Sequence, residues 1–177
     1  MSWNDFYRRR DVMDAVLRQA ARNPGGELPF ADVPGAAQAF ACEEDLLLAL
    51  HYRWTQLLSG YLRAEVAGPE DAEGVPGDNE DHVDAVTRAC HAAAADHDTL
   101  RAVLDANLDR YASLRSMREA EQRMLAITAG LAEPHEPVEE ITKVGAAFDA
   151  LLRNGPARPA RRRSPVGSLL RMLAPSA

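Results

Sequence analysis

The chain has 177 residues, a formal net charge of −7 and a hydrophobic share of 46%, which suits one domain with a real core. No apolar run approaches the roughly 20 residues that a membrane-crossing helix needs, and the N-terminus shows no apolar signal region. The two cysteines, Cys42 and Cys90, lack CxxC or Cys/His spacing, which argues against a disulfide framework or a zinc site. We expect a cytoplasmic protein without a metal or another cofactor.

Helical spacing of apolar residues predicts a first helix from about Asp5 to Arg22. Its shared face consists of Phe6, Met13, Val16, Leu17 and Ala20. The Asn-Pro-Gly-Gly run at 23–26 stops this helix. The segment 27–35 holds two prolines and Phe30, so we expect a connector that packs one aromatic ring.

The strongest pattern in the chain predicts one long core helix from near Pro34 to just before Gly68. Its apolar positions are Leu47, Leu50, Trp54, Leu57, Leu58 and Tyr61. Three acids at 43–45 suit the start of this helix, because the helix dipole favours negative charge there. Residues 68–82 then contain six acids, three glycines and two prolines, a composition that predicts a solvated loop. The order of these acids lacks the spacing of a calcium-binding EF-hand loop.

Residues 83–107 form one apolar seam with steps of three and four. The seam runs through Val83, Val86, Cys90, Ala93, His97, Leu100, Leu104 and Asn107. It predicts one long helix or two nearly collinear ones, and the acids on both sides of His97 favour a break there because they can cap a new helix. A further helix, from about Leu114 to Leu131, has the inward positions Leu114, Met117, Ala120, Met124, Ile127 and Leu131.

The last predicted helix begins at Val138, after a turn at 133–137 that contains two prolines. It ends at Asn154, because a glycine and a proline follow. No segment alternates apolar and polar residues for long enough to predict a strand. We therefore predict an all-α protein, with one bundle of five or six helices in residues 1–155 and a flexible tail at 156–177.

Nothing in the chain is typical of an enzyme. The five histidines form no HxxxH, HExxH or ExxH pair of the kind that binds metal in helical bundles. There is no GxSxG nucleophile motif and no phosphate-binding glycine loop. We expect no catalytic, cofactor-binding or metal-binding residue, and a protein that works by binding.

Five side chains are candidates for lining a small-molecule cavity between helices, as aromatic and methionine residues do in ligand-sensing bundles. They are Trp54, Tyr61, His97, Met117 and Met124. Ordinary core packing explains the same positions, so both interpretations stay open. The seams at 83–107 and 114–131 are candidates for a homodimer contact, on the argument that one bundle does not bury both fully.

Residues 40–50, followed by Arg53, resemble the segment with which TetR-family regulators leave their DNA-binding region. The shared features are an aromatic residue, a short polar turn, an acid and a leucine-rich run. Residues 95–109 and 119–132 are similar to parts of the ligand-binding helical region in that family. The resemblance covers residues 12–152 in outline and implies a helical, ligand-sensing and dimerising regulatory protein.

The chain departs from the TetR pattern in its DNA-binding part. A TetR-like protein needs two helices between its first helix and the aromatic that is here Phe40. Only residues 23–39, with three prolines, are available for them. The would-be recognition segment at 34–39 offers only Gln38 for reading bases. We therefore expect a shortened segment that does not read DNA sequence.

The tail at 156–177 differs in charge from the rest of the chain. It holds five arginines and no acid, whereas the remaining residues comprise 15 basic and 27 acidic ones, a net charge of −12. A Pro/Ala/Arg spacer precedes a short apolar patch. Part of that patch is similar to the C-terminal peptides that dock cargo inside encapsulin shells: Val166, Gly167, Ser168, Leu169, Leu170 and Arg171. A docked adaptor or cargo, binding to a membrane surface or a partner groove, and a plain disordered end all stay open.

Overall fold

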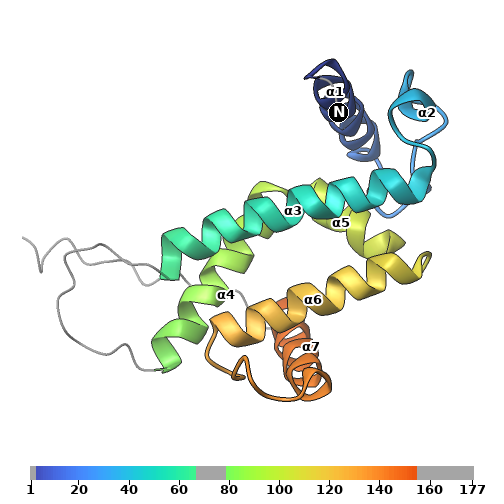
Figure 1. Ribbon diagram of the computed structural model, residues 1–177. Helices are drawn as coiled ribbons and strands as arrows, with labels where there is room; N and C mark the ends of the chain where they lie inside the picture. Colours follow the sequence, from blue (N-terminus) through green and yellow to red (C-terminus); the bar gives the residue numbers. More distant parts are fainter. Residues whose placement is uncertain (1–2, 67–78, 155–177) are drawn as a thin grey trace, which may run out of the picture.

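The computed structural model describes residues 3–66 and 79–154, and these stretches contain seven helices and no strand (Figure 1). The helices are α1 Trp3–Ala20, α2 Ala36–Ala39, α3 Glu43–Val66, α4 Asn79–Asp96, α5 Asp98–Asn107, α6 Ala112–Thr128 and α7 Val138–Asn154. The predicted all-α class is confirmed, with seven helices in place of five or six. None of the described helices is long and apolar enough to cross a bilayer. The tail with its candidate docking residues at 166–171 lies outside the described residues.

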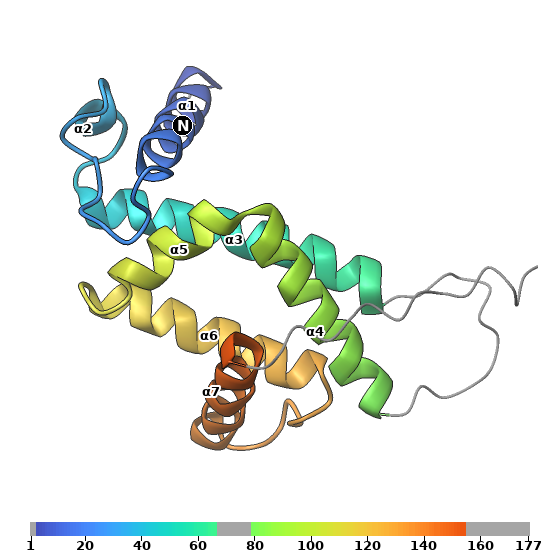
Figure 2. The same cartoon turned by 180° about the vertical axis from the view of Figure 1, so that it is seen from behind.

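Helix α3 runs along the molecule and organises the other helices (Figures 1 and 2). Helices α4, α5 and α6 all pack against α3, and α7 packs on the side of α6 that faces away from α3. Helices α1 and α2 pack together above the N-terminal half of α3, where α1 also contacts α5. One hydrophobic core therefore extends from α1 through α3 to α6.

Helix α3 is the core helix that the sequence predicts. Its buried face consists of Leu46, Leu47, Leu50, His51, Trp54, Leu58 and Leu62, and each fully buried leucine contributes about 1.5–3 kcal/mol. The predicted start near Pro34 is wrong, because the chain leaves helical geometry at Phe40, whose backbone is extended (φ −133°, ψ 136°). Phe40 is buried, and the Arg9 guanidinium lies 4.3 Å from its ring centre. The short helix α2 is therefore separated from α3 by an anchored turn.

The acids at the start of α3 also connect it to the rest of the bundle. Glu43 Oε2 accepts a hydrogen bond from Arg110 Nη2 at 2.8 Å, and Glu44 Oε1 accepts one from the Ser113 hydroxyl at 2.5 Å. Arg110 lies between α5 and α6, and Ser113 is in the first turn of α6. Glu43 and Glu44 therefore do more than complement the helix dipole, because they also fix α3 to the start of α6.

The predicted break between two helices at 96–98 is confirmed. His97 has a non-helical backbone (φ −131°, ψ 41°) between α4 and α5. The Asp98 carboxylate accepts the backbone N–H of Thr99, whereas Asp96 accepts a hydrogen bond from the Tyr61 hydroxyl at 2.5 Å. Residues 79–82, which were expected in the acidic loop, belong to α4.

Helix α6 ends three residues before the predicted position. Gly130 adopts a left-handed backbone with φ 68°. The backbone N–H groups of Gly130 and Leu131 then bond back to the carbonyls of Ile127 and Ala126. This pattern is the Schellman motif. It ends a helix with a residue in the left-handed conformation, which glycine adopts easily because it has no Cβ atom.

The seam at 83–107 is largely covered within the chain, whereas the seam at 114–131 is covered only in part. The seam residues that are buried in the main core are Val86, Ala93, Leu100, Leu104 and Leu114, while Ala120 and Leu131 are exposed. One bundle therefore buries the first seam but not the whole of the second.

Candidate ligand-binding cleft

A cleft of about 260 Å³ lies within the bundle. Its lining residues come from α3, α4, α5, α6 and α7: Trp54, Leu58, Cys90, His91, Ala94, Arg101, Asp105, Glu121, Leu125, Asp149, Leu152 and Arg153. One part of the lining is apolar and the other part is charged. Such a division suits a ligand that has an apolar body and a polar group.

Only one of the five residues predicted to line a cavity, Trp54, lies in this lining. Tyr61 and His97 pack edge to face, with ring centres 6.2 Å apart, but they are not part of the cleft wall. Met124 packs against the main core, and Met117 is half-buried on α6. The structure therefore does not bring these five side chains together around one cavity.

A buried ion network forms the charged part of the cleft and continues beneath it. Arg118 on α6 is only 5% exposed. Its Nη2 donates to both carboxylate oxygens of Asp149 on α7, at 2.7 and 2.8 Å, and its Nη1 donates to Glu121 Oε1 at 2.9 Å. Gln122 Nε2 also donates to Asp149, at 3.0 Å. The network therefore joins α6 to α7 through hydrogen bonds within the core.

Two further arginines complete the network at the cleft. Arg101 on α5 donates from Nη1 to Glu121 Oε1 at 2.9 Å and from Nε to Asp105 Oδ2 at 3.0 Å. Arg153, one turn after Asp149 on α7, donates to the Asp149 carboxylate. Arg101 also lies over the Trp54 ring, 5.1 Å from its centre. This placement is typical of a cation–π contact, so the charged and apolar parts of the wall meet at Trp54.

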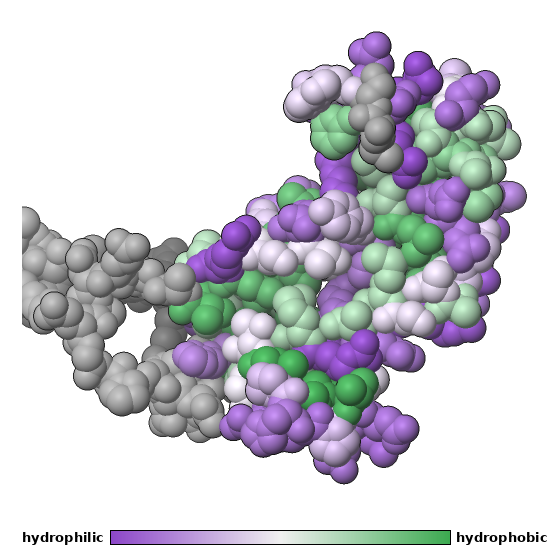
Figure 3. All heavy atoms as spheres, viewed as in Figure 1, coloured by the Kyte–Doolittle hydropathy of each residue, from purple (hydrophilic) through white to green (hydrophobic). Residues whose placement is uncertain are grey.

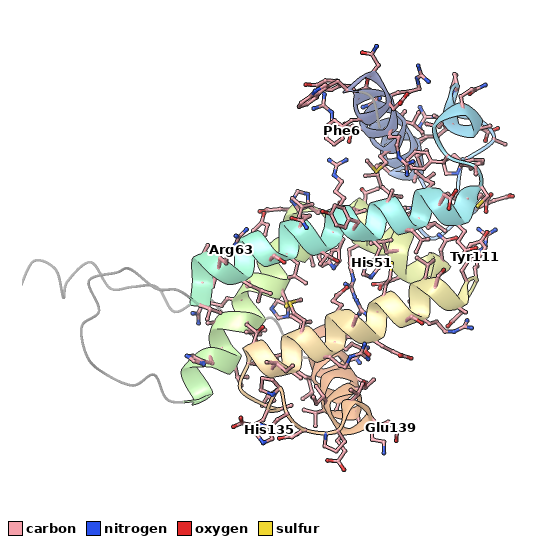
Figure 4. All side chains as sticks on the ribbon, in the orientation of Figure 1. Phe6, His51, Arg63, Tyr111, His135 and Glu139 are labelled. Carbon is pink, nitrogen blue, oxygen red and sulfur yellow. The ribbon has the colours of Figure 1, made fainter. Side chains whose placement is uncertain are left out.

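His51 connects α3 to this network. It is buried on the side of α3 that faces α6 (Figure 4), and its Nε2 lies 3.5 Å from Glu121 Oε2. Burial lowers the pKa of His51 and outweighs the neighbouring Glu121 carboxylate, which raises it. The imidazole is therefore neutral at physiological pH, with one ring nitrogen available to donate toward Glu121.

Asp149 and Cys90 in the cleft also have shifted pKa values. Burial by itself raises the pKa of the Asp149 carboxyl, but Arg118, Gln122 and Arg153 outweigh it and hold that pKa below its usual value. Burial raises the pKa of the Cys90 thiol to about 12. Asp149 is therefore ionised and Cys90 protonated at neutral pH. Cys90 is thus a poor nucleophile, because the thiolate is the reactive form.

Three buried polar atoms of the described residues have no hydrogen-bond partner: Trp54 Nε1, Arg118 Nε and Glu121 Oε2. An unmade hydrogen bond in a core costs about 1–3 kcal/mol. All three belong to the cleft wall or to the network beneath it. Within the described stretches, no group of His, Cys, Asp and Glu side chains has the arrangement of a metal site.

Sequence reasoning missed this network because it placed only apolar residues of α6 in the core. The buried face consists of Leu114, Arg118, Glu121, Gln122, Leu125 and Ala126, whereas the predicted inward positions Ala120 and Leu131 are exposed. A detectable signal was the run of polar residues with helical spacing between Leu114 and Leu125. Comparison with protein-family models, curated proteins and solved structures found no match for this chain.

Proposed function

We propose that this chain is a non-enzymatic, helical regulatory protein that binds a small molecule in the cleft between α3 and α7. The observation that carries the proposal is the cleft itself, about 260 Å³ in volume and lined by both apolar and charged side chains. Ligand sites in proteins are concave and mostly apolar, with a few placed polar groups. This assignment agrees with the resemblance to the ligand-sensing part of TetR-type regulators.

The buried ion network supports a binding role. Replacing such a network by apolar residues of similar volume is often neutral or stabilising, so buried ion pairs add little to stability. Here Glu121 and Asp149 line the cleft, and Arg118 is buried beneath its wall and donates to both. Perturbed titratable groups in a cleft are typical of functional sites. The network would therefore fix the positions of hydrogen-bonding groups in the cleft wall, where the ligand binds.

Helix α3 provides a physical link between the cleft and the N-terminal helices. Trp54 and Leu58 on α3 line the cleft. Arg53, the residue directly before Trp54, donates to Asp14 on α1 at 2.5 Å. A ligand that shifts α3 would therefore move α1 as well. This link supports a sensor whose output lies at the N-terminal end.

The described N-terminal part offers little for reading DNA. Helix α2 has four residues, Ala36–Ala39, and Gln38 is its one residue with a polar side chain. Recognition helices carry several side chains that reach base edges. We therefore propose that the output surface contacts a protein partner and does not recognise a DNA sequence.

A search for co-purified ligand tests the proposed function. The full chain would be purified from its host and heated, and the released small molecules would be identified by mass spectrometry. Ala94→Phe places a ring in the cleft, whereas Ala146→Phe places the same ring on the exposed surface of α7. A compound that is present with the wild type and Ala146→Phe but lost with Ala94→Phe supports the proposal. Equal recovery from both variants, or no compound at all, contradicts it.

A further inference from the structure

We infer that the ligand of this cleft is a small amphipathic carboxylate. Its carboxyl group would accept hydrogen bonds from Arg101 and Arg153, while its apolar body would lie against the apolar wall formed by Trp54, Leu58, Ala94, Leu125 and Leu152. The inference rests on the proposed function, because it names the chemical class bound at the same site.

The first argument is that the buried carboxylate of Asp149 is already fully used. Asp149 accepts hydrogen bonds from Arg118, Gln122 and Arg153. Glu121 Oε1 accepts two hydrogen bonds, whereas its Oε2 accepts none and is buried 3.5 Å from His51 Nε2. A carboxylate accepts about four hydrogen bonds. An ammonium group on a ligand would therefore have to displace a guanidinium group to bind Asp149.

The second argument is that hydrogen-bond donors remain unused on the same wall. A guanidinium group carries about five N–H donors. Arg101 Nη2 lies 3.9 Å from Asp149 Oδ1, which is too far for a hydrogen bond. Arg153 donates only through Nη2 among the described residues, and nearly half of its side chain is exposed. Unused guanidinium donors favour a ligand that accepts hydrogen bonds, and carboxylates fit them best.

The third argument concerns charge at the cleft opening. Asp105 lies one turn after Arg101 on α5, and 36% of its side chain is exposed. It is the carboxylate that a ligand anion could most readily replace at Arg101. Asp105 therefore competes with an anionic ligand, and removing its charge should strengthen the binding of a carboxylate. This direction is opposite to the effect expected for removing Arg153.

The volume limits the size of the ligand. A cleft of about 260 Å³ is at the small end of ligand sites, which measure about 300–1,000 Å³. A six-carbon acid is therefore a ligand of suitable size. Hexanoate is therefore a suitable probe, with hexanol and hexylamine as analogues that keep the chain and change only the head group.

Trp54 provides the readout. The chain has two tryptophans, and Trp3 is 75% exposed at the start of α1. Trp3→Phe therefore leaves Trp54 as a single fluorophore in the cleft wall. In this background we expect hexanoate to bind about tenfold more tightly than either analogue, a difference of about 1.4 kcal/mol. Arg153→Gln should weaken hexanoate binding several-fold and Asp105→Asn should strengthen it, with hexanol binding unchanged in both variants.

Three results would overturn the inference. Tightest binding by hexylamine, or equal binding by all three probes, would show that the wall does not select a carboxylate, while the proposed binding function would stand. If none of the three probes changed the Trp54 fluorescence, that result would also contradict the inference. The compound recovered from the purified chain separates the two claims, because a ligand without a carboxyl group refutes the inference and supports the function.

Discussion

At the residue scale, the contact between Arg118 and Asp149 shows how strongly one pair can matter in this core. Both side chains are buried, and each is the main partner of the other. Removing one partner of a buried ion pair leaves an uncompensated charge and costs about 3–5 kcal/mol. We expect Arg118→Met to destabilise the protein by that amount in urea unfolding.

The matched control for this prediction is the double variant Arg118→Met with Asp149→Leu. It removes both charges and should recover most of the lost stability. A single variant that costs less than about 1 kcal/mol would show that the pair is not desolvated as the structure indicates.

His51 gives the protein a specific dependence on pH. Its pKa in the folded state lies below the ordinary value of 6.5, mainly because of burial. Below that ordinary value the unfolded chain binds a proton that the folded chain does not, so stability falls as the pH drops through 6.5. The slope from this group is at most about 1.4 kcal/mol per pH unit. His51→Gln should flatten the stability profile below neutral pH, and an unchanged profile would contradict the assignment.

The two cysteines should differ in reactivity. Cys42 is exposed, whereas Cys90 lines the cleft and its pKa is raised to about 12 by burial. The thiolate is the reactive form, so we expect a thiol reagent to modify Cys42 at least about a hundredfold faster. Single Cys42→Ser and Cys90→Ser variants assign the two rates. Equal rates would mean that the cleft is open to solvent and less protective than the structure shows.

At the scale of elements, Gly145 sets the close approach of α7 to α6. A Cβ atom at this position would clash with the backbone carbonyl oxygen of Gln122. Gly145→Ala should therefore push the helices apart and lower stability by about 1–3 kcal/mol, although alanine favours a helix. Thermal unfolding measures the effect.

Gly60 on α3 is the matched control for Gly145. A Cβ atom there meets nothing within 4 Å, so Gly60→Ala should raise stability by about 0.5–1 kcal/mol. Effects of the same sign at both glycines would show that the α6–α7 contact is looser than described.

At the scale of the whole molecule, the exposed surface bears on self-association. Hydrophobic residues gather over α6 and α7 on the face shown in Figure 3. Leu131 is 41% exposed, Val138 63% and Leu151 69%. We propose a homodimer through the α6–α7 surface, where these three side chains are exposed.

Sedimentation of the full chain tests the proposed dimer. At tens of micromolar we expect twice the chain mass of 19.3 kDa, and Val138→Glu should shift the equilibrium toward the monomer because it places a charge in the contact. A monomeric mass for the wild type would contradict the proposal. An unaffected dimer in the variant would place the contact elsewhere.

The sequence by itself determined the helical class, the long core helix α3, the break at His97 and the end of α7 at Asn154. These features depend on local properties, which are apolar spacing, caps and helix-stopping residues. The errors at helix ends arose where the end depends on more than these local properties. The start of α3 depends on how Phe40 packs, and the end of α6 on the left-handed backbone of Gly130.

Only the tertiary structure decided which face of α6 is buried and which residues line the cleft. Arg118 can be buried because Asp149, 31 positions later, neutralises it, and Glu121 because Arg101 lies on another helix. Apolar periodicity places charged residues outside the core by default, since an unpaired buried charge is too costly. Pairing removes most of that cost, and pairing is a property of the fold that the sequence pattern of one helix does not contain.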